Sequence, residues 1–327
     1  MPFLAERGLA TEEDLEHTEE RGSLSGAHAD AVTHKAVSRG HTQVGSLGAG
    51  NHFLEIQEVV EVYDPKAAEA FGVKPGQICI MIHCGSRGLG HQVCTDYIQI
   101  LEGATKKYGI TLPDRQLACA PLQSQEGKKY FGAMAASANY AWANRQIIMH
   151  MVREVFARMF GLAHEEMRLV YDVAHNVAKF EEHRVGGNRT RVCVHRKGAT
   201  RAFGPGSADL PPAYLSIGQP VIIPGSMGTP SFLLKGTGTA MEKTFGSTCH
   251  GAGRVMSRTK AKHALSGNVV RQTLAAEGII VRAHNPGALA DEAPQVYKPS
   301  GEVVRVVHEA GISRMVARFA PLGVIKG

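Results

Sequence analysis

The alternation of apolar and polar residues predicts two strands in the first quarter of the chain. Residues 53–57 alternate, which places Phe53, Glu55 and Gln57 on one face of a strand that follows a glycine-rich loop. Residues 78–83 form a short continuous apolar run, which is typical of a buried strand. Both segments are bordered by glycines, so each strand is expected to end in a loop that turns sharply.

Helical spacing and shorter apolar runs account for much of the remaining chain. The first forty residues are charged and compatible with helix, and Thr11 is followed by acids as at a helix start. Apolar residues at helical spacing predict a long helix over about 131–160. Further strands are predicted at 168–174, 191–195 and 219–223, and a basic helix that includes Arg254 after His250. These elements, without a repeat or a linker, predict one compact α/β domain over residues 1–327.

Composition supports a folded protein of the cytoplasm. The 327 residues are 43% hydrophobic, enough for a substantial core, and the formal net charge is +6. No apolar run approaches the roughly 20 residues that cross a bilayer, and the first residues do not resemble a signal peptide. The six cysteines form no CxxC pair, so reduced thiols are expected. We therefore expect a cytoplasmic location and no membrane partner.

Four histidines lie where strands end or loops begin, which predicts one shared site. They are His52, His83, His175 and His250. A single buried histidine is more often a core residue, but four in equivalent positions favour metal binding or proton transfer. Imidazole ligands suit Zn, Cu, Ni or Mn, so the residue type leaves the metal open.

Neighbouring residues refine the roles predicted for two of these histidines. His83 is followed directly by Cys84, and adjacent strand residues point to opposite faces, so one ion is not expected to bind both. We choose His83 as the ligand and assign Cys84 to the core. Asp172 or Asn176 can fix the tautomer of His175.

Two loops contain the residue types that bind phosphate. Residues 195–201 carry three cations around a glycine, which predicts an anion site, with a solvated basic turn as the alternative. Residues 224–231 combine glycines and hydroxyls after a strand, but no Gly-Lys-Ser/Thr closes them as in a Walker A motif. A P-loop or Rossmann nucleotide site is therefore disfavoured.

The densest cluster of functional residue types surrounds His250. Glycines flank this histidine and Arg254 follows it. A neutral imidazole is nucleophilic near pH 7, and a guanidinium stabilises charge on phosphoryl oxygens. Cys249 is a rival nucleophile or ligand with a packing role as its simpler explanation. The residues alone therefore predict metal-assisted phosphoryl or nucleotidyl transfer.

These motifs together resemble one family, the RtcB-type RNA-splicing ligases. The matching segments occur in family order between about residues 16 and 327, and they read GSLGAGNHFLEIQ, MIHCGSRGLGHQ, YDVAHN, VHRKGATRAF, GSMGTPSF, TFGSTCHGAGR and GVIKG. The resemblance implies an α/β fold with mixed central β-sheets and outer helices. It also implies ligation of an RNA 3′-phosphate or 2′,3′-cyclic phosphate to a 5′-hydroxyl, as in tRNA splicing and RNA repair.

The resemblance also implies the roles of individual residues. His250 corresponds to the histidine that attacks the α-phosphate of GTP and becomes guanylylated. His52, His83 and His175 correspond to ligands of two Mn²⁺ ions, which polarise phosphates. The residues implied to bind the guanine nucleotide or its phosphates are Asn51, Glu55, Ser226, Ser231, Gly251, Ala252, Gly253, Arg254, Tyr297 and Lys326.

One difference from the family pattern keeps alternative functions open. The family segment that supplies an aspartate and a cysteine to the metals has no counterpart in this sequence, so the domain is expected to be N-terminally truncated. The chain can be a ligase, alone or completed by a partner chain. It can instead be an impaired fragment that binds guanine nucleotide and RNA, or a different histidine–metal phosphotransferase or hydrolase. The resemblance also implies an archease-like activator.

Overall fold

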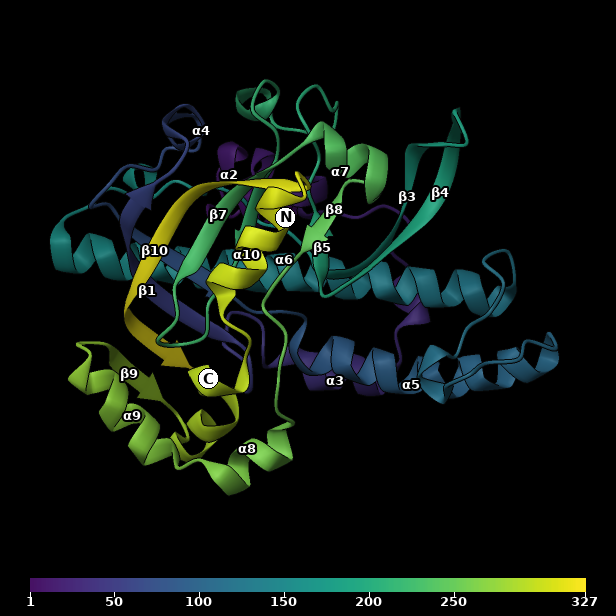
Figure 1. Ribbon diagram of the computed structural model, residues 1–327. Helices are drawn as coiled ribbons and strands as arrows, with labels where there is room; N and C mark the ends of the chain where they lie inside the picture. The colour runs from purple at the N-terminus through teal and green to yellow at the C-terminus, as the bar shows by residue number, and fades with distance from the viewer. The chain divides into compact units, whose positions relative to one another are not determined.

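The computed structural model describes the backbone of residues 1–327 and all side chains except those of residues 116, 286 and 288. The chain forms two compact units, each built from two stretches (Figure 1). Residues 1–46 and 84–168 form the first, called here the helical unit, and residues 47–83 and 169–327 form the second, the sheet unit. Within the residues described, no helix is long and apolar enough to cross a membrane.

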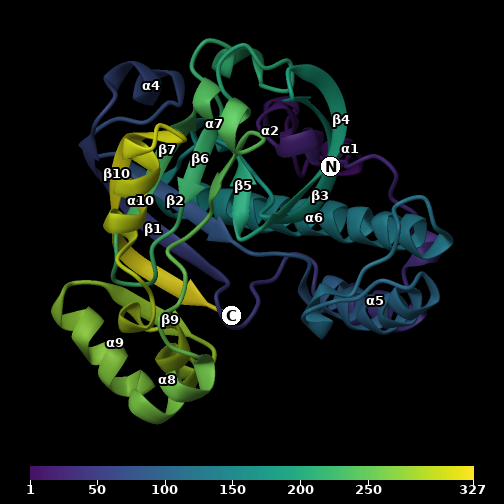
Figure 2. The ribbon, with the colours of Figure 1, turned by 45° about the vertical axis from the view of Figure 1, so that its right-hand side comes forward.

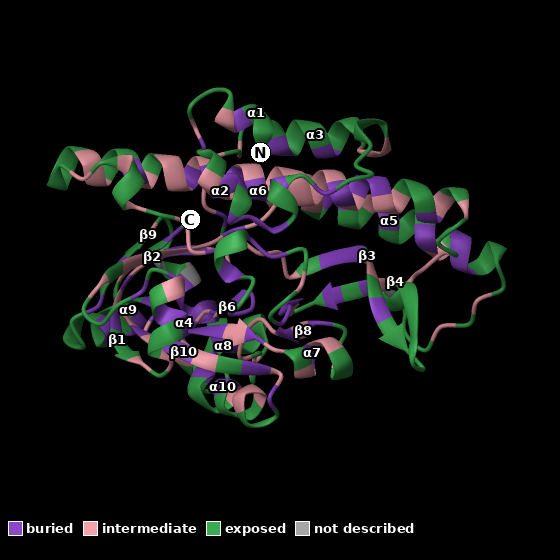
Figure 3. Ribbon diagram, turned by 90° about the horizontal axis from the view of Figure 1, so that it is seen from above, coloured by how far each residue is buried: buried purple, intermediate pink, exposed green. Residues whose placement is uncertain are grey.

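The helical unit is organised by one helix of 36 residues, α6 (Gln125–Phe160), in which buried and exposed stretches alternate (Figure 3). Its buried positions include Trp142, which has no exposed surface. The other helices of this unit are α1 (Pro2–Ala5), α2 (Glu12–Glu16), η1 (Glu19–Gly22), η2 (Ala29–Ala31), α3 (His34–His41), α5 (Arg87–Lys107), η3 (Arg115–Leu117) and η4 (His164–Glu166).

Small residues let three of these helices approach closely. Ala36 of α3, Val93 of α5 and Ala133 of α6 belong to one buried cluster. A Cβ on Gly40 of α3 would lie 2.8 Å from the Cβ of Leu89 in α5, which is closer than packed carbons come. Glycine at this position therefore permits the contact between α3 and α5.

The sheet unit is built around a six-stranded sheet with the order β2-β1-β10-β7-β6 and β9 added beside β10. Figure 1 shows β10 between β1 and β7. All pairs are antiparallel except β10 with β9, so the sheet is mixed, as predicted. The strands are β1 (Phe53–Val62), β2 (Ile78–His83), β6 (Pro220–Ile223), β7 (Ser231–Gly236), β9 (Ile280–Ala283) and β10 (Ser313–Lys326).

Two smaller sheets and several helices complete the sheet unit. The smaller sheets are β3 (Asn176–Val185) with β4 (Asn188–Lys197), and β5 (Ala199–Arg201) with β8 (Ser247–Cys249). In Figure 2, α8 and α9 lie beside β9 at one end of the unit. The helices are α4 (Pro65–Ala70), η5 (Pro212–Tyr214), α7 (Gly238–Lys243), α8 (Arg258–Ala264), α9 (Gly267–Ala276), η6 (Pro286–Glu292), η7 (Pro294–Val296) and α10 (Ser300–Glu309).

Most predicted elements are confirmed, one strand is wrong, and one helix begins later than predicted. The strand over 78–83 and the face shared by Phe53, Glu55 and Gln57, all buried, are as expected. The strand predicted over 168–174 is wrong because regular pairing begins only at Asn176. Tyr171 and its apolar neighbours instead pack into the core as a connecting segment, which accounts for their hydrophobicity.

The basic helix after His250 begins later than predicted. Helix α8 starts at Arg258, and Ser257 caps it by accepting a hydrogen bond from the Lys260 amide. Arg254 lies before the helix, in an isolated bridge with Tyr297. Its position is therefore fixed by a residue more than forty positions away in the sequence.

Candidate active site

The ends of four strands of the sheet unit bring the four predicted histidines together. His52 directly precedes β1, and His83 is the last residue of β2, where it pairs with Phe53. His175 directly precedes β3, and His250 directly follows β8. Because each residue stands at a strand end, its ring is free of the ladder and can face a common space.

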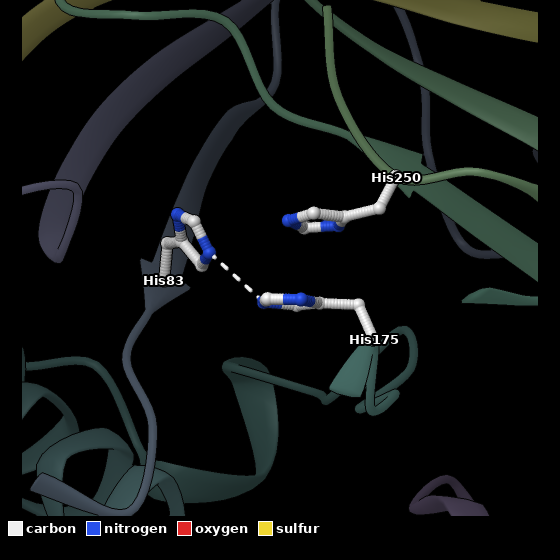
Figure 4. Close-up of side chains that lie close together, drawn as sticks. All are labelled: His83, His175 and His250. Atoms are coloured by element: carbon white, nitrogen blue, oxygen red, sulfur yellow. Dashed lines mark hydrogen bonds between the residues drawn. The ribbon is translucent and has the colours of Figure 1, made fainter. Parts of the chain in front are cut away.

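Three of the rings form a tight cluster (Figure 4). The Nε2 atoms of His83 and His175 are 3.3 Å apart. The rings of His175 and His250 are stacked, with centroids 3.7 Å apart and planes 10° from parallel. The ring centroid of His83 lies 5.1 Å from that of His250 and 6.2 Å from that of His52.

A glycine turn ties His175 to His250 through the backbone. The amide of Gly198 donates to the carbonyl of His175 at 3.0 Å, and the amide of His250 donates to the carbonyl of Gly198 at 3.2 Å. Gly198 has a φ of 64°, a left-handed conformation that favours glycine. The stacked arrangement of the two rings is therefore supported by main-chain hydrogen bonds.

The environment keeps the imidazoles of His83 and His250 neutral. Burial lowers the pKa of His250 to about 3, with further contributions from His175 and Lys197. Burial and the neighbouring histidines hold the pKa of His83 well below its usual range. A neutral imidazole has a free lone pair, which is the form that binds metals and attacks electrophiles.

The cluster can hold a metal ion. One nitrogen each from His83, His175 and His250 lies within 4.8 Å of the other two. Nitrogens that share one ion at about 2.1 Å must lie a little over 3 Å apart, as those of His83 and His175 do. The Nδ1 atom of His83 is buried without a hydrogen-bond partner, so this ring has unused bonding capacity.

A buried carboxylate lies on the same strand as Phe53. Glu55 is fully buried, and burial raises its pKa to about 7 in spite of a hydrogen bond from Gln57 to its Oε1 and the positive charge of Lys326. Its Oε2 atom is buried without a partner. Gln57 also donates to the hydroxyl of Ser231 at 2.8 Å, which connects the start of β7 to the carboxylate.

The penultimate lysine is buried rather than solvated. Lys326 donates to the carbonyl of Gly50 at 3.0 Å, and its Nζ lies 5.4 Å from the ring centroid of Phe53. Burial lowers its pKa to about 8, opposed by the nearby carboxylates Glu292 and Glu55. The ring of Phe53 also contacts that of His83 edge-on at 5.3 Å, which links Lys326 to the histidine cluster.

Glu292 organises the remaining predicted residues, although no motif or spacing in the sequence marks it. Tyr297 donates to its Oε2, and Arg254 lies 3.4 Å from its Oε1. Its carbonyl accepts from the hydroxyl of Ser226 at 2.7 Å. Burial and the hydrogen bond to Glu292 raise the pKa of Tyr297. Arg258, 3.3 Å from Glu292, is a second residue that sequence reasoning missed.

The loops around these side chains leave space. Asn51 is half-buried in the turn before β1. A Cβ at Gly251 or Gly253 would meet nothing within 4 Å, so the segment Gly251–Ala252–Gly253 borders open space. Gly225 is different, because a Cβ there would lie 2.2 Å from the carbonyl oxygen of Thr229 and would prevent the loop from folding back.

Three other predicted features have structural roles in the described residues. Cys84 is buried, and Cys249 packs beside a core cluster, where burial raises the pKa of its thiol. In the predicted anion loop, Arg196 and Arg201 are buried, and Arg196 pairs with Glu181. Only Lys197 of the three cations is exposed, so the loop offers one cation to an anion, not three.

Known proteins resemble this chain over its full length. A family model described as tRNA-splicing ligase RtcB matches residues 1–327. The chain is 62% identical to the tRNA-splicing ligase RtcB of Archaeoglobus fulgidus and 56% identical to that of Methanococcus maripaludis, in each case over 99% of this chain and 68% of the relative. It is 55% identical to that of Methanocaldococcus jannaschii, over 34% of the relative. The chain therefore belongs to the RtcB family of tRNA-splicing ligases.

Proposed function

We propose that this chain is an RNA ligase that joins a 3′-phosphate or 2′,3′-cyclic phosphate to a 5′-hydroxyl, as in tRNA splicing and RNA repair. His250 attacks the α-phosphorus of GTP, a nitrogen–phosphorus bond forms, and pyrophosphate leaves. The GMP then passes to the RNA 3′-phosphate, and the 5′-hydroxyl displaces it. The observation that carries this proposal is the neutral ring of His250, stacked on His175 beside His83.

The geometry supports a role for His175 beyond metal binding. A ring stacked at 3.7 Å restricts rotation of His250 and orients its nitrogens. The neighbouring Gly251 leaves the space beside His250 open. A nucleophile that is already oriented and deprotonated loses little entropy and requires no proton transfer when the phosphate arrives.

His52, His83 and His175 are proposed to hold Mn²⁺. When bound, the metal polarises the phosphates and neutralises charge that develops during transfer. The convergent nitrogens of His83 and His175 and the unused Nδ1 of His83 support this assignment for those two residues, and the family resemblance adds His52. Oxygen ligands from water or substrate are expected to complete the coordination.

Glu55 is proposed to select guanine. Its free Oε2 can accept from the N1–H and N2–H₂ groups of guanine, which adenine does not present in that arrangement. Ser231 is connected to Glu55 through Gln57. Lys326 and Tyr297, both close to buried carboxylates, would face the nucleotide with a positive charge and a hydroxyl.

The loop residues are proposed to contact the phosphates. Asn51, Ser226 and Arg254 can donate to phosphate oxygens, together with the backbone of Gly251, Ala252 and Gly253. Arg254 lies between Glu292 and Tyr297, so its guanidinium is already oriented. By the same family resemblance, we propose a cytoplasmic location and activation by an archease-like partner.

Labelling with GTP tests the proposal. The purified chain is incubated with α-³²P-labelled GTP and Mn²⁺, and covalent label is measured on a denaturing gel. We expect label that His250→Ala abolishes, a loss of roughly a thousandfold or more for removal of a nucleophile. His263→Ala, which changes an exposed histidine in α8, is the matched control and retains label.

The same experiment separates the ligase from the alternatives. Label that persists in His250→Ala contradicts the proposed nucleophile. Nucleotide binding without any label favours a fragment that binds GTP and RNA. Phosphatase activity in the absence of GTP favours a different histidine–metal enzyme.

A further inference from the structure

The hairpin of β3 and β4 carries one strongly basic face. Direct cross-strand partners share a face, and so do residues two apart in a strand. The pairs Glu182 with Arg191 and Arg184 with Arg189 therefore lie on the same side as Phe180 and Lys197. We call this set of six residues the basic face: Phe180, Glu182, Arg184, Arg189, Arg191 and Lys197.

The opposite face of the hairpin anchors it to the rest of the sheet unit. Arg196 pairs with Glu181 and donates to the carbonyl of Phe245 at 2.9 Å. His183 is buried and contacts the ring of Phe245 edge-on at 5.4 Å. The basic face is therefore the one directed outward, and Figure 3 shows the far end of the hairpin as exposed.

The charge on the basic face is largely uncompensated. Arg184, Arg189, Arg191 and Lys197 oppose a single carboxylate, that of Glu182. Arg189 lies 3.2 Å from Glu182, but the side chains of this pair are 80% and 46% exposed. A pair so exposed contributes little free energy, so a phosphate can compete for the guanidinium.

An aromatic platform lies within this row of cations. Phe180 is 41% exposed, and the Cζ atom of Arg191 lies 5.0 Å from its ring centroid. Bases of single-stranded nucleic acid stack on aromatic rings and guanidinium planes, while the adjacent cations bind the phosphates. An acidic peptide would use the charges but would have no flat group to stack on the ring.

The basic face is continuous with the active site. Lys197 ends β4, and the next residue, Gly198, is hydrogen-bonded to the backbones of both His175 and His250. The nine residues from Arg189 to Lys197 span about 26 Å of strand. The basic face therefore ends beside the backbone that holds His175 and His250.

We propose that the basic face binds the single-stranded end of an RNA substrate and leads it to His250. The inference rests on the proposed function, because it names the surface that holds the RNA of that reaction. Arginines bind the phosphates, and Phe180 with Arg191 stacks a base. Because neither interaction reads a base edge, binding is expected to depend on salt and not on sequence.

Salt-dependent RNA binding tests the proposal. Fluorescence anisotropy of a labelled single-stranded RNA with a 3′-phosphate is measured against the wild type and the triple variant Arg184→Ser/Arg189→Ser/Arg191→Ser. We expect affinity at low salt to fall by about tenfold or more, and the slope of log K against log salt to become shallower by about 2. Phe180→Ala is expected to weaken binding by about fivefold or more with an unchanged slope.

A matched control removes the same charge elsewhere in the sheet unit. Arg271→Ser/Arg282→Ser/Arg305→Ser changes three exposed arginines outside the hairpin and is expected to bind RNA within about twofold of wild type. Equal RNA binding by the hairpin variants and the control overturns the proposal.

GTP labelling of the same proteins separates this inference from the proposed function. Retained label with weakened RNA binding assigns the defect to the basic face. If the triple variant loses both RNA binding and GTP label, the Phe180→Ala variant, which changes no charge, decides between the explanations. Weakened RNA binding with retained label in that variant supports the proposal, and unchanged RNA binding overturns it. If the wild type takes no label while the RNA-binding contrast persists, the proposed function fails and the RNA surface stands.

Discussion

Both units of this protein bury ionisable groups, but the buried ion pair of the helical unit and the buried groups around the candidate active site of the sheet unit differ in how far they are partnered. In the helical unit, the carboxylate of Asp14 accepts two hydrogen bonds from Arg153, at 2.7 and 2.8 Å, and others from Gln146 and the Thr11 amide. Burial alone would raise the pKa of Asp14, but these partners outweigh it and the pKa is lowered. The buried charge is fully partnered, as in a structural ion pair.

In the sheet unit, Glu181 and Arg196 also form a complete pair, but two buried groups near the candidate active site are left without partners. Glu55 has an oxygen without a partner, and burial raises its pKa to about 7. His83 has a buried Nδ1 without a partner, and its pKa is lowered. A buried polar atom without a partner costs folding free energy, so its retention points to a ligand that completes it. The comparison separates a charge that stabilises the fold from groups held ready for a substrate.

The largest expected effect comes from breaking the buried ion pair between Arg153 and Asp14. Arg153→Met leaves Asp14 buried and unpaired, and we expect a loss of about 3–5 kcal/mol in the free energy of unfolding. Trp142, the one tryptophan of the chain, is buried in the helical unit, so its fluorescence in urea reports this loss. The double variant Asp14→Asn/Arg153→Met should be less destabilised than Arg153→Met alone. A loss below about 1 kcal/mol in the single variant would contradict a structural role for the pair.

Removing the charge of Glu55, which has a buried oxygen without a partner, should increase the free energy of unfolding. The pKa of Glu55 is raised from 4.5 to about 7 on folding, so the folded state holds the proton more tightly. Stability therefore falls as pH rises from 4.5 to 7, and the full cost, about 3 kcal/mol, persists above pH 7.

Glu55→Gln removes this cost, and we expect the variant to be more stable than wild type at pH 8.5 but equal to it at pH 4. Denaturation followed by circular dichroism measures the difference. Glu58→Gln, on the other face of the same strand, is the control and should show no such gain. GTP labelling of Glu55→Gln should decrease, since stability and binding oppose one another at this residue. A stability gain that does not depend on pH would contradict the assignment of this cost to the buried Glu55 carboxylate.

A metal should stabilise the sheet unit through the clustered histidines. At a hundredfold excess over Kd, a bound ion adds about 2.7 kcal/mol to the free energy of unfolding. We expect Mn²⁺ to raise the thermal midpoint of the wild type and of His263→Ala, and EDTA to reverse the effect. His83→Ala should lose most of the shift, and an undiminished shift in that variant would place the metal elsewhere.

The smallest expected effect concerns the N-terminal cap of α2, which lies beside the Arg153–Asp14 pair. Thr11 accepts from the Asp14 amide, and its own amide donates to the Asp14 carboxylate, which forms a capping box at α2. Thr11→Ala should cost about 1 kcal/mol, measured by Trp142 fluorescence. Thr11→Ser, which keeps the hydroxyl, should restore most of this loss, and GTP labelling should not change in either variant.

Local patterns in the sequence determined much of this protein. The alternation in residues 53–57 correctly put Phe53, Glu55 and Gln57 on the buried face, because side-chain direction in a strand has a period of two. The capping signal at Thr11 and the four histidines at loop and strand boundaries were equally readable, since each depends on a few adjacent residues. The motif order also identified the family.

Only the tertiary structure decided which distant residues meet. The pairing of β1 with β10 joins segments more than 250 residues apart, and it buries Lys326, which the sequence alone would leave as a solvated tail. Glu292 became recognisable only when Tyr297, Arg254 and Arg258 were found around it. The stacking of His175 on His250 likewise requires two loops joined through Gly198. Such contacts have no local period, because they depend on long-range packing that no short window of sequence encodes.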